Sequence, residues 1–201
     1  MSHYVLAPLV IRHMTTKKTG IAGCEIVPVS GNRDARGCLY EIYRQSWPNA
    51  FVAVQWNACA SGAGVVRGAH VHVDYDEFYT LPQGRVVLGL ADIRKESPTF
   101  KHSAQIDWAD KEDFAVLVPR GVVHVVLFNE DSVLALGLSG YWRAELDIVG
   151  CQWDDPELGF AWPDTAVHRS QRDVHSGGYT EMLLLYEELS YKWSRSPLSA
   201  R

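Results

Sequence analysis

The 201-residue sequence lacks the features that mark membrane-spanning, secreted or disulfide-stabilised proteins. No apolar run approaches the roughly 20 residues that cross a bilayer as a helix. A short apolar run precedes the first positive charges, the reverse of a secretory signal peptide. The four cysteines are widely spaced and form no CxxC pair, which indicates free thiols. We therefore expect a cytoplasmic protein with no membrane partner.

Positive charge is also scarce. Lysine and arginine number 19 against 24 acidic residues, and no basic cluster is longer than Lys17-Lys18. A nucleic-acid partner is therefore not expected, because such binding needs a basic face. The net charge of −5 does not exclude a local basic pocket for one phosphate group.

The chain contains no internal repeat, low-complexity segment or linker, so we expect one domain over residues 1–201. We divide it into an N-terminal arm (1–25), a barrel (26–165) and a C-terminal helical segment (166–201). Short apolar runs separated by turn signals predict many short strands, as in an all-β barrel or sandwich. They lie at 51–56, 85–91, 115–118, 122–128 and 133–138. Helical spacing at 179–193 predicts one helix outside the barrel.

Four candidate metal ligands stand out. The stretch GAGVVRGAHVHVDYDEFYTLPQG (62–84) contains His70, His72 and Glu77, and VPRGVVH (118–124) ends at His124. These stretches resemble the two consensus motifs of the cupin superfamily, which implies a cupin (jelly-roll) barrel. The second motif departs in two places: Asp113 replaces the usual glycine, and the asparagine comes one residue late.

The spacing supports a common site. Alternate residues of a strand point to one face, so His70 and His72 should project together into the barrel. Glu77 follows a turn on the returning strand, and His124 comes from a later strand. Three imidazoles and a carboxylate suit a divalent transition ion such as Fe, Mn, Ni, Cu or Zn, without choosing among them. The alternative interpretations are hydrogen-bonded core histidines, or a site that holds a substrate instead.

A second resemblance covers residues 26–173. The motifs are DARG with YE (34–41), QWN (55–57), VRGAH (66–70), DIRKESPTF (92–100), PRGVVH (119–124), WDDPEL with AWP (153–163) and SQRD (170–173). In this order they are similar to motifs of the dTDP-4-dehydrorhamnose 3,5-epimerase family. The resemblance implies a homodimeric isomerase that acts on nucleotide-linked 4-keto-6-deoxyhexoses. It also implies residues that contact the nucleotide, diphosphate or sugar: Arg36, Glu41, Gln55, Asn57 and Arg67.

The family's chemistry is proton removal next to a ketone. By resemblance, His70 is the base and Asp173 orients it. The family's lysine, which steadies the enolate, falls on Glu77, and its proton-donating tyrosine falls on Leu136 or Gly137. Neither Leu136 nor Gly137 can donate a proton, so the inherited machinery is incomplete. The nearest tyrosine that could act as the acid is Tyr141, a candidate catalytic residue.

Three functions follow as hypotheses. The first is a nucleotide-sugar epimerase or ketoisomerase in which a metal ion replaces the lysine as a Lewis acid. His70 could then hardly be both ligand and base. The second is a metal-dependent cupin of another class, such as an oxygenase, decarboxylase or lyase. The third is a non-catalytic sugar-nucleotide binding protein.

Overall fold

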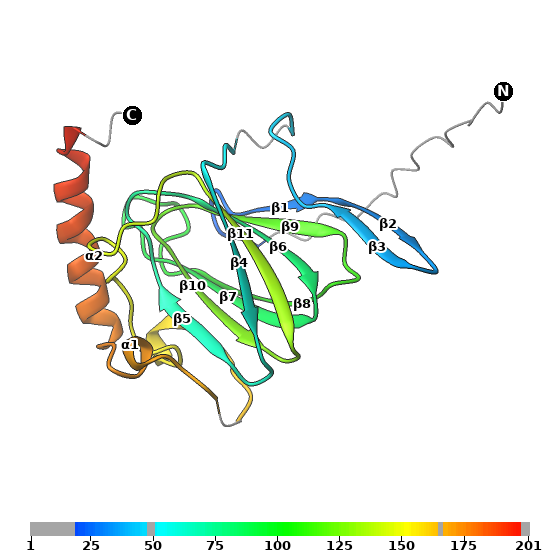
Figure 1. The fold of residues 1–201 in the computed structure, drawn as a ribbon. Coiled ribbons are helices and arrows are strands. Elements are labelled where there is room, and N and C mark those ends of the chain that lie inside the picture. The colour runs from blue at the N-terminus through cyan, green and yellow to red at the C-terminus, as the bar shows by residue number, and fades with distance from the viewer. Residues whose placement is uncertain (1–18, 48–50, 165–166, 198–201) are drawn as a thin grey trace.

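The computed structural model describes residues 19–47, 51–164 and 167–197. Most of the predicted N-terminal arm lies outside these residues. Two antiparallel sheets face each other and form a barrel of the cupin type (Figure 1). The larger sheet runs in the order β1 (Glu25–Pro28), β9 (Phe114–Val118), β6 (Glu77–Gln83), β11 (Ser132–Leu138) and β4 (Gln55–Ser61). The smaller sheet runs β5 (Val66–His70), β10 (Val122–Phe128), β7 (Arg85–Asp92) and β8 (Ser103–Ala109).

Strand β10 shows how the apolar pattern places functional side chains. Every residue of this strand is buried, because both faces of the smaller sheet are covered. Val122, Val126 and Phe128 pack into the core between the sheets. Val123, Val125 and Leu127 pack into a second core on the outer face. His124 is in phase with the inward set, so it faces the barrel interior.

A C-terminal helix covers that outer face, as the sequence predicted. Helix α2 (Tyr179–Ser194) buries Tyr179 and Met182 against the outer core of the smaller sheet (Figure 1). Before it come a 3₁₀ turn, η1 (Pro156–Leu158), and a one-turn helix, α1 (Gln171–Val174). Among the described residues, no helix is both long and apolar enough to cross a membrane.

Two strand predictions need correction. Residues 51–54 lie outside any strand, and the strand expected at 51–56 begins only at Gln55. Strand β5 ends at His70, so His72 lies beyond it in irregular backbone. After Leu138 the described chain forms no further named strand, and residues 139–164 contain no named element except η1.

A hydrogen-bonded turn follows β7 and explains the DIRKESPTF motif structurally. The buried Asp92 carboxylate accepts hydrogen bonds from Arg94 (2.8 Å), Ser97 (2.6 Å) and Thr99 (2.7 Å). Burial alone would raise the pKa of Asp92, but these hydrogen bonds outweigh it and hold the pKa at about 2. Arg94 also donates to the carbonyl of Ala22 at 2.6 Å, which ties the start of the described chain to the barrel.

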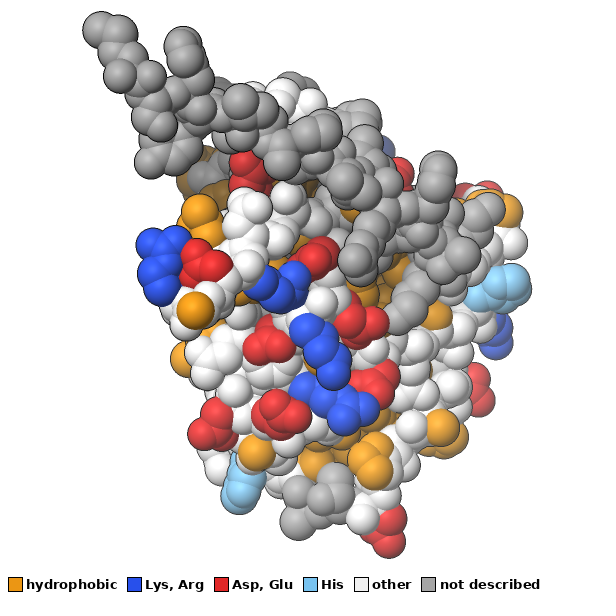
Figure 2. All heavy atoms as spheres, turned by 90° about the vertical axis from the view of Figure 1, so that its right-hand side faces the viewer, with side chains coloured by type: hydrophobic (Ala, Val, Ile, Leu, Met, Phe, Trp, Pro, Cys, Tyr) orange, Lys and Arg blue, Asp and Glu red, His pale blue; other side chains and the backbone are white. Residues whose placement is uncertain are grey.

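A hairpin of β2 (Ser30–Asp34) and β3 (Gly37–Glu41) extends away from the barrel (Figure 1). Its Arg33 pairs with Asp113, which is the residue that departs from the cupin motif. Figure 2 views the molecule from the hairpin side. Basic and acidic side chains are interleaved on this face and form no patch of one sign.

Candidate active site

A cavity of about 660 Å³ lies between the two sheets. Its polar wall includes His70, His72, Glu77, His124 and Asp173, while β11 contributes an aliphatic wall. The apolar lining residues include Val66, Val126, Phe128, Leu134, Leu136 and Leu138. The cavity therefore joins a cluster of titratable groups to a hydrophobic surface, which is typical of small-molecule sites.

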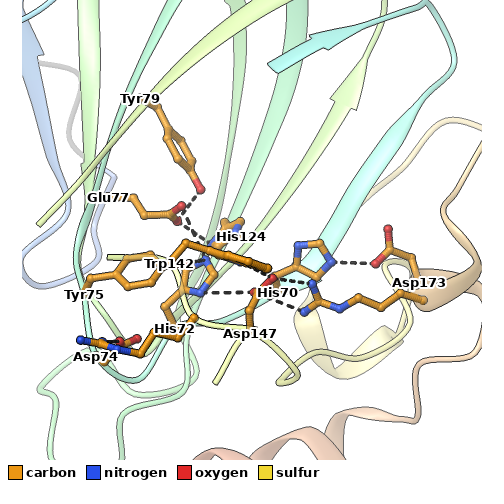
Figure 3. Close-up of polar contacts among 12 residues, drawn as sticks. His70, His72, Asp74, Tyr75, Glu77, Tyr79, His124, Trp142, Asp147 and Asp173 are labelled. Carbon is orange, nitrogen blue, oxygen red and sulfur yellow. Dashed lines mark hydrogen bonds and ion pairs between the residues drawn. The ribbon is translucent and has the colours of Figure 1, made fainter. Parts of the chain in front are cut away.

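Three of the four predicted metal ligands converge. His72, Glu77 and His124 each offer a donor atom, and these atoms lie within 4.8 Å of one another. Nε2 of His72 is 3.5 Å from Oε1 of Glu77, and Nδ1 of His124 is 3.3 Å from Oε2. All three residues are buried, and their side chains lie close together in Figure 3. Tyr79 holds Glu77 by donating its hydroxyl to Oε2 at 2.6 Å.

The protonation states suit metal ligation. Burial lowers the pKa of His124 to about 4, so its imidazole is neutral near pH 7. Burial by itself would raise the pKa of Glu77, but the imidazoles of His124 and His72 and the Tyr79 hydroxyl favour the anion and bring this pKa below its usual range. Among the described residues, none forms a hydrogen bond with the buried Nδ1 of His124, and its contact with Glu77 at 3.3 Å lacks hydrogen-bond geometry. A buried polar atom without a partner is costly, and a coordinated cation would satisfy it.

His72 is the exception, because its environment favours the proton. Burial would lower the pKa of His72, but Glu77 outweighs it and raises the pKa. An incoming cation therefore has to displace this proton.

His70, the fourth predicted ligand, does not join the cluster. Its Nε2 lies 2.7 Å from Oδ1 of Asp173, and its ring centroid is 6.0 Å from that of His124. His70 and His72 both line the cavity, as expected, but they do not share one ligand cluster. Strand β5 ends at His70, so strand alternation does not continue to His72. His70 and Asp173 instead form a pair at the side of the cavity (Figure 3).

Helix α1 presents Asp173 to His70. Ser170 caps α1 by accepting the backbone N–H of Asp173 at 3.1 Å. Burial would raise the pKa of Asp173, but the hydrogen bond with His70 outweighs it and lowers the pKa. The carboxylate is therefore anionic and accepts from Nε2 of His70. This fixes the neutral ring as the tautomer whose Nδ1 carries the lone pair.

The predicted substrate contacts divide into two groups. Asn57 and Arg67 line the cavity. Gln55, the first residue of β4, supports Asn57 by donating to it at 3.0 Å and accepts a hydrogen bond from the backbone of Trp142 at 3.0 Å. These side chains therefore lie where a bound molecule would reach them.

Arg36 and Glu41 do not line the cavity of their own chain. They lie on the hairpin and pair locally with Asp34 and Arg44. Tyr141, the predicted proton donor, is 62% exposed and is also outside the cavity lining.

The site includes residues to which the sequence analysis gave no role. Tyr79, Asp147 and Arg172 contribute to the cavity or its polar network. Backbone pairing of residues 149–151 with residues 69–71 brings Asp147 to His72. No local sequence signal announces that long-range pairing.

Neither position of the expected family tyrosine offers a hydroxyl. Leu136 lines the cavity, and Gly137 packs under the ring of Trp56. Glu77, where the resemblance places the family's lysine, belongs to the cluster with His72 and His124.

The jelly-roll barrel, its internal cavity and the His70–Asp173 pair define a cupin-type enzyme of the isomerase class. The family model described as dTDP-4-dehydrorhamnose 3,5-epimerase matches residues 18–180. The chain belongs to this family.

Similar proteins agree with this assignment. The dTDP-4-dehydrorhamnose 3,5-epimerase of Methanothermobacter thermautotrophicus is 26% identical over 159 residues, covering 73% of this chain and 82% of the relative. A 4-keto-6-deoxy sugar epimerase from the novobiocin gene cluster of Streptomyces spheroides superposes with a TM-score of 0.74 at 27% identity, over 87% of this chain and 93% of that one. A 3'-monoepimerase from Streptomyces bikiniensis, solved with dTDP-quinovose, gives a TM-score of 0.72 at 25% identity over 84% and 88%.

Proposed function

We propose that this protein is an epimerase or isomerase of nucleotide-linked 4-keto-6-deoxyhexoses and acts by removing a proton next to the ketone. The observation that carries the proposal is the 2.7 Å contact between His70 and Asp173 at the wall of the cavity. Family relatives are named for dTDP-linked keto sugars, and one solved relative holds the nucleotide sugar dTDP-quinovose. The cavity has room for the hexose of such a substrate.

His70 is the base in this proposal. Its Nε2 hydrogen is committed to Asp173, so the lone pair of Nδ1 is free to take the proton from C3 or C5. The anionic Asp173 stabilises the imidazolium that forms, as an orienting carboxylate does in other His-based sites.

The developing enolate needs a positive partner, and Glu77 stands where the family has lysine. His72, Glu77 and His124 have the donor set and the unpartnered nitrogen that fit a divalent transition ion. When bound, such an ion supplies Lewis-acid stabilisation of oxygen charge. Fe, Mn, Ni, Cu and Zn all suit these ligands.

A proton has to be returned to the sugar. Tyr141 is exposed and does not line the cavity, so we assign this role to Tyr75, which does. The Tyr75 hydroxyl lies 3.4 Å from Nε2 of His72, whereas the Tyr79 hydroxyl is engaged by Glu77. Burial raises the pKa of Tyr75, so the hydroxyl keeps its proton until the enolate of the sugar forms next to it and accepts that proton.

Deuterium exchange tests the reaction. Purified protein, with and without added Zn²⁺ or Mn²⁺, is incubated with a dTDP-4-keto-6-deoxyhexose in D₂O, and H70N serves as the matched variant. We expect deuterium at C3, C5 or both with the wild-type protein and none with H70N. No incorporation under any metal condition would eliminate the proposal.

A metal-dependent oxygenase is the second candidate, because two histidines and one carboxylate are also the ligand set of non-haem iron oxygenases. Oxygen consumption by iron-loaded protein in the presence of the keto sugar would favour it. Exchange in strictly anaerobic buffer would favour the isomerase.

We also propose a homodimer in the cytoplasm. The hairpin carries Arg36 and Glu41 away from their own cavity, and a second copy would bring them to a nucleotide in the neighbouring site. The described cysteines are all free thiols, which suits a reducing compartment. Light scattering after size exclusion should give twice the mass of the chain. A monomeric mass with full activity would contradict the dimer.

A further inference from the structure

The two histidines of the His70-Val71-His72 segment each face a different carboxylate. His70 contacts Asp173 at 2.7 Å. His72 faces Asp147, with Nδ1 at 3.7 Å from Oδ1. Two adjacent residues of α1 contact these pairs. Asp173 contacts His70 directly (Figure 3), and Arg172 forms an ion pair with Asp147.

Asp147 is held firmly. Its Oδ2 accepts hydrogen bonds from Nη1 of Arg172 at 2.9 Å and from the indole N–H of Trp142 at 2.8 Å. A second guanidinium nitrogen lies 3.5 Å from Oδ1. The side chain is only 15% exposed, so the carboxylate faces the site in a fixed orientation. A paired arginine and an indole N–H leave it little freedom to rotate.

The backbone aligns Asp147 with His72. Val71 donates to the carbonyl of Val149 at 3.2 Å, and Cys151 donates to the carbonyl of Ala69 at 3.1 Å. Gly150 permits this approach, because a Cβ there would lie 2.3 Å from the Ala69 carbonyl oxygen. The segment that carries Asp147 therefore moves with the segment that carries both histidines.

A carboxylate at Nδ1 has a direct consequence for Nε2. The Asp147 carboxylate lies on the Nδ1 side of His72, at 3.7 Å, and Glu77 lies on the Nε2 side, at 3.5 Å. Once a cation displaces the extra proton, Asp147 favours the tautomer that keeps the hydrogen on Nδ1 and leaves the Nε2 lone pair towards Glu77. Metal-binding histidines ordinarily have such an outer carboxylate, which fixes the tautomer and makes the ligating nitrogen more basic. Asp173 does the reverse at His70, because it engages Nε2 and draws the ring away from the cluster.

We propose that Asp147, held by Arg172, is a positioning residue that presents His72 to a divalent metal ion bound by His72, Glu77 and His124, while Asp173 keeps His70 outside that ion's coordination. Helix α1 thereby gives different roles to two histidines that are only two residues apart in the sequence, with His72 as the metal ligand and His70 as the base. The ion site can be tested without any sugar, and only its catalytic use rests on the proposed function.

The test measures metal affinity in the purified, full-length protein. Zn²⁺ is titrated in competition with a chromophoric chelator, and Co²⁺ spectra report the coordination. The variants are D147N, R172M, R172K, H70N and H72N, with the exposed Asp154→Asn as matched control. Thermal unfolding of each metal-free variant shows whether it is folded.

We expect one Zn²⁺ per wild-type chain and an affinity about 10- to 100-fold lower in D147N and R172M, as for other outer-shell partners. R172K should recover most of this loss, because an ammonium still pairs with Asp147. H70N and D154N should bind Zn²⁺ as the wild type does, with the same Co²⁺ spectrum, and H72N should lose the site.

Three results would overturn the inference: a wild-type chain that binds no ion, a folded D147N that binds as tightly as the wild type, or an H70N that weakens binding as much as H72N. If D147N does not fold, R172M and R172K answer the same question from the other partner. Failure of the proposed function has a different signature, namely normal Zn²⁺ binding without deuterium exchange into the sugar.

Discussion

Replacing Asp173 by asparagine removes the charge that supports His70 and keeps the shape of the side chain. At 2.7 Å and an effective dielectric constant of about 20, this carboxylate attracts a protonated His70 by about 6 kcal/mol, an upper bound. A charged hydrogen bond contributes at least about 1.5 kcal/mol net. Each tenfold change in rate corresponds to about 1.4 kcal/mol, so these bounds span roughly 10-fold to 10⁴-fold.

We expect D173N to slow exchange at C3 or C5 by about 10² to 10⁴, the usual contribution of general-base catalysis. The assay is the initial rate of deuterium incorporation from D₂O, followed by mass spectrometry at saturating keto sugar. Asp154→Asn serves as control, since this exposed residue lies outside the cavity. A folded D173N that exchanges within tenfold of the wild-type rate would refute the assignment of His70 as the supported base.

Three further predictions follow from the structure. Glu77→Gln removes the only carboxylate of the three-residue cluster and should weaken Zn²⁺ binding by more than about 100-fold, which chelator competition measures. Asp92 has a folded-state pKa of about 2, below its ordinary 3.8, so its ionised carboxylate contributes about 2 kcal/mol of stability. This contribution is fully present above about pH 4 and is lost as the pH falls towards 2, and D92N should show no such loss in acid denaturation. Gly150→Ala forces a Cβ against the Ala69 carbonyl oxygen and should cost about 1–3 kcal/mol in urea unfolding, whereas an unchanged midpoint would show that the two segments separate freely.

Several features could be read from local sequence because local chemistry determines them. Alternating apolar residues predicted β7, β9, β10 and β11 within about one residue at each end. Helical spacing predicted α2, which ends at Ser194 rather than at residue 193. The motif residues His72, Glu77 and His124 were predicted to converge and do so.

The role of His70 could not be decided in this way. Two resemblances gave it incompatible roles, as a metal ligand and as a base. The choice depends on where β5 ends and on whether Asp173, 103 residues further along the chain, reaches Nε2. Asp147 was missed for the same reason, because only the pairing of residues 149–151 with residues 69–71 brings it to His72.

The sequence by itself determined the kinds of side chain available, the barrel that carries them and the family to which the chain is similar. Those properties follow from periodicity and from motifs within a few residues of one another. Only the tertiary structure decided which imidazole faces which carboxylate, because a side chain's partner is set by backbone pairing between distant segments. That long-range pairing places Asp173 at His70, the candidate base, and Asp147 at His72, the candidate metal ligand two residues away.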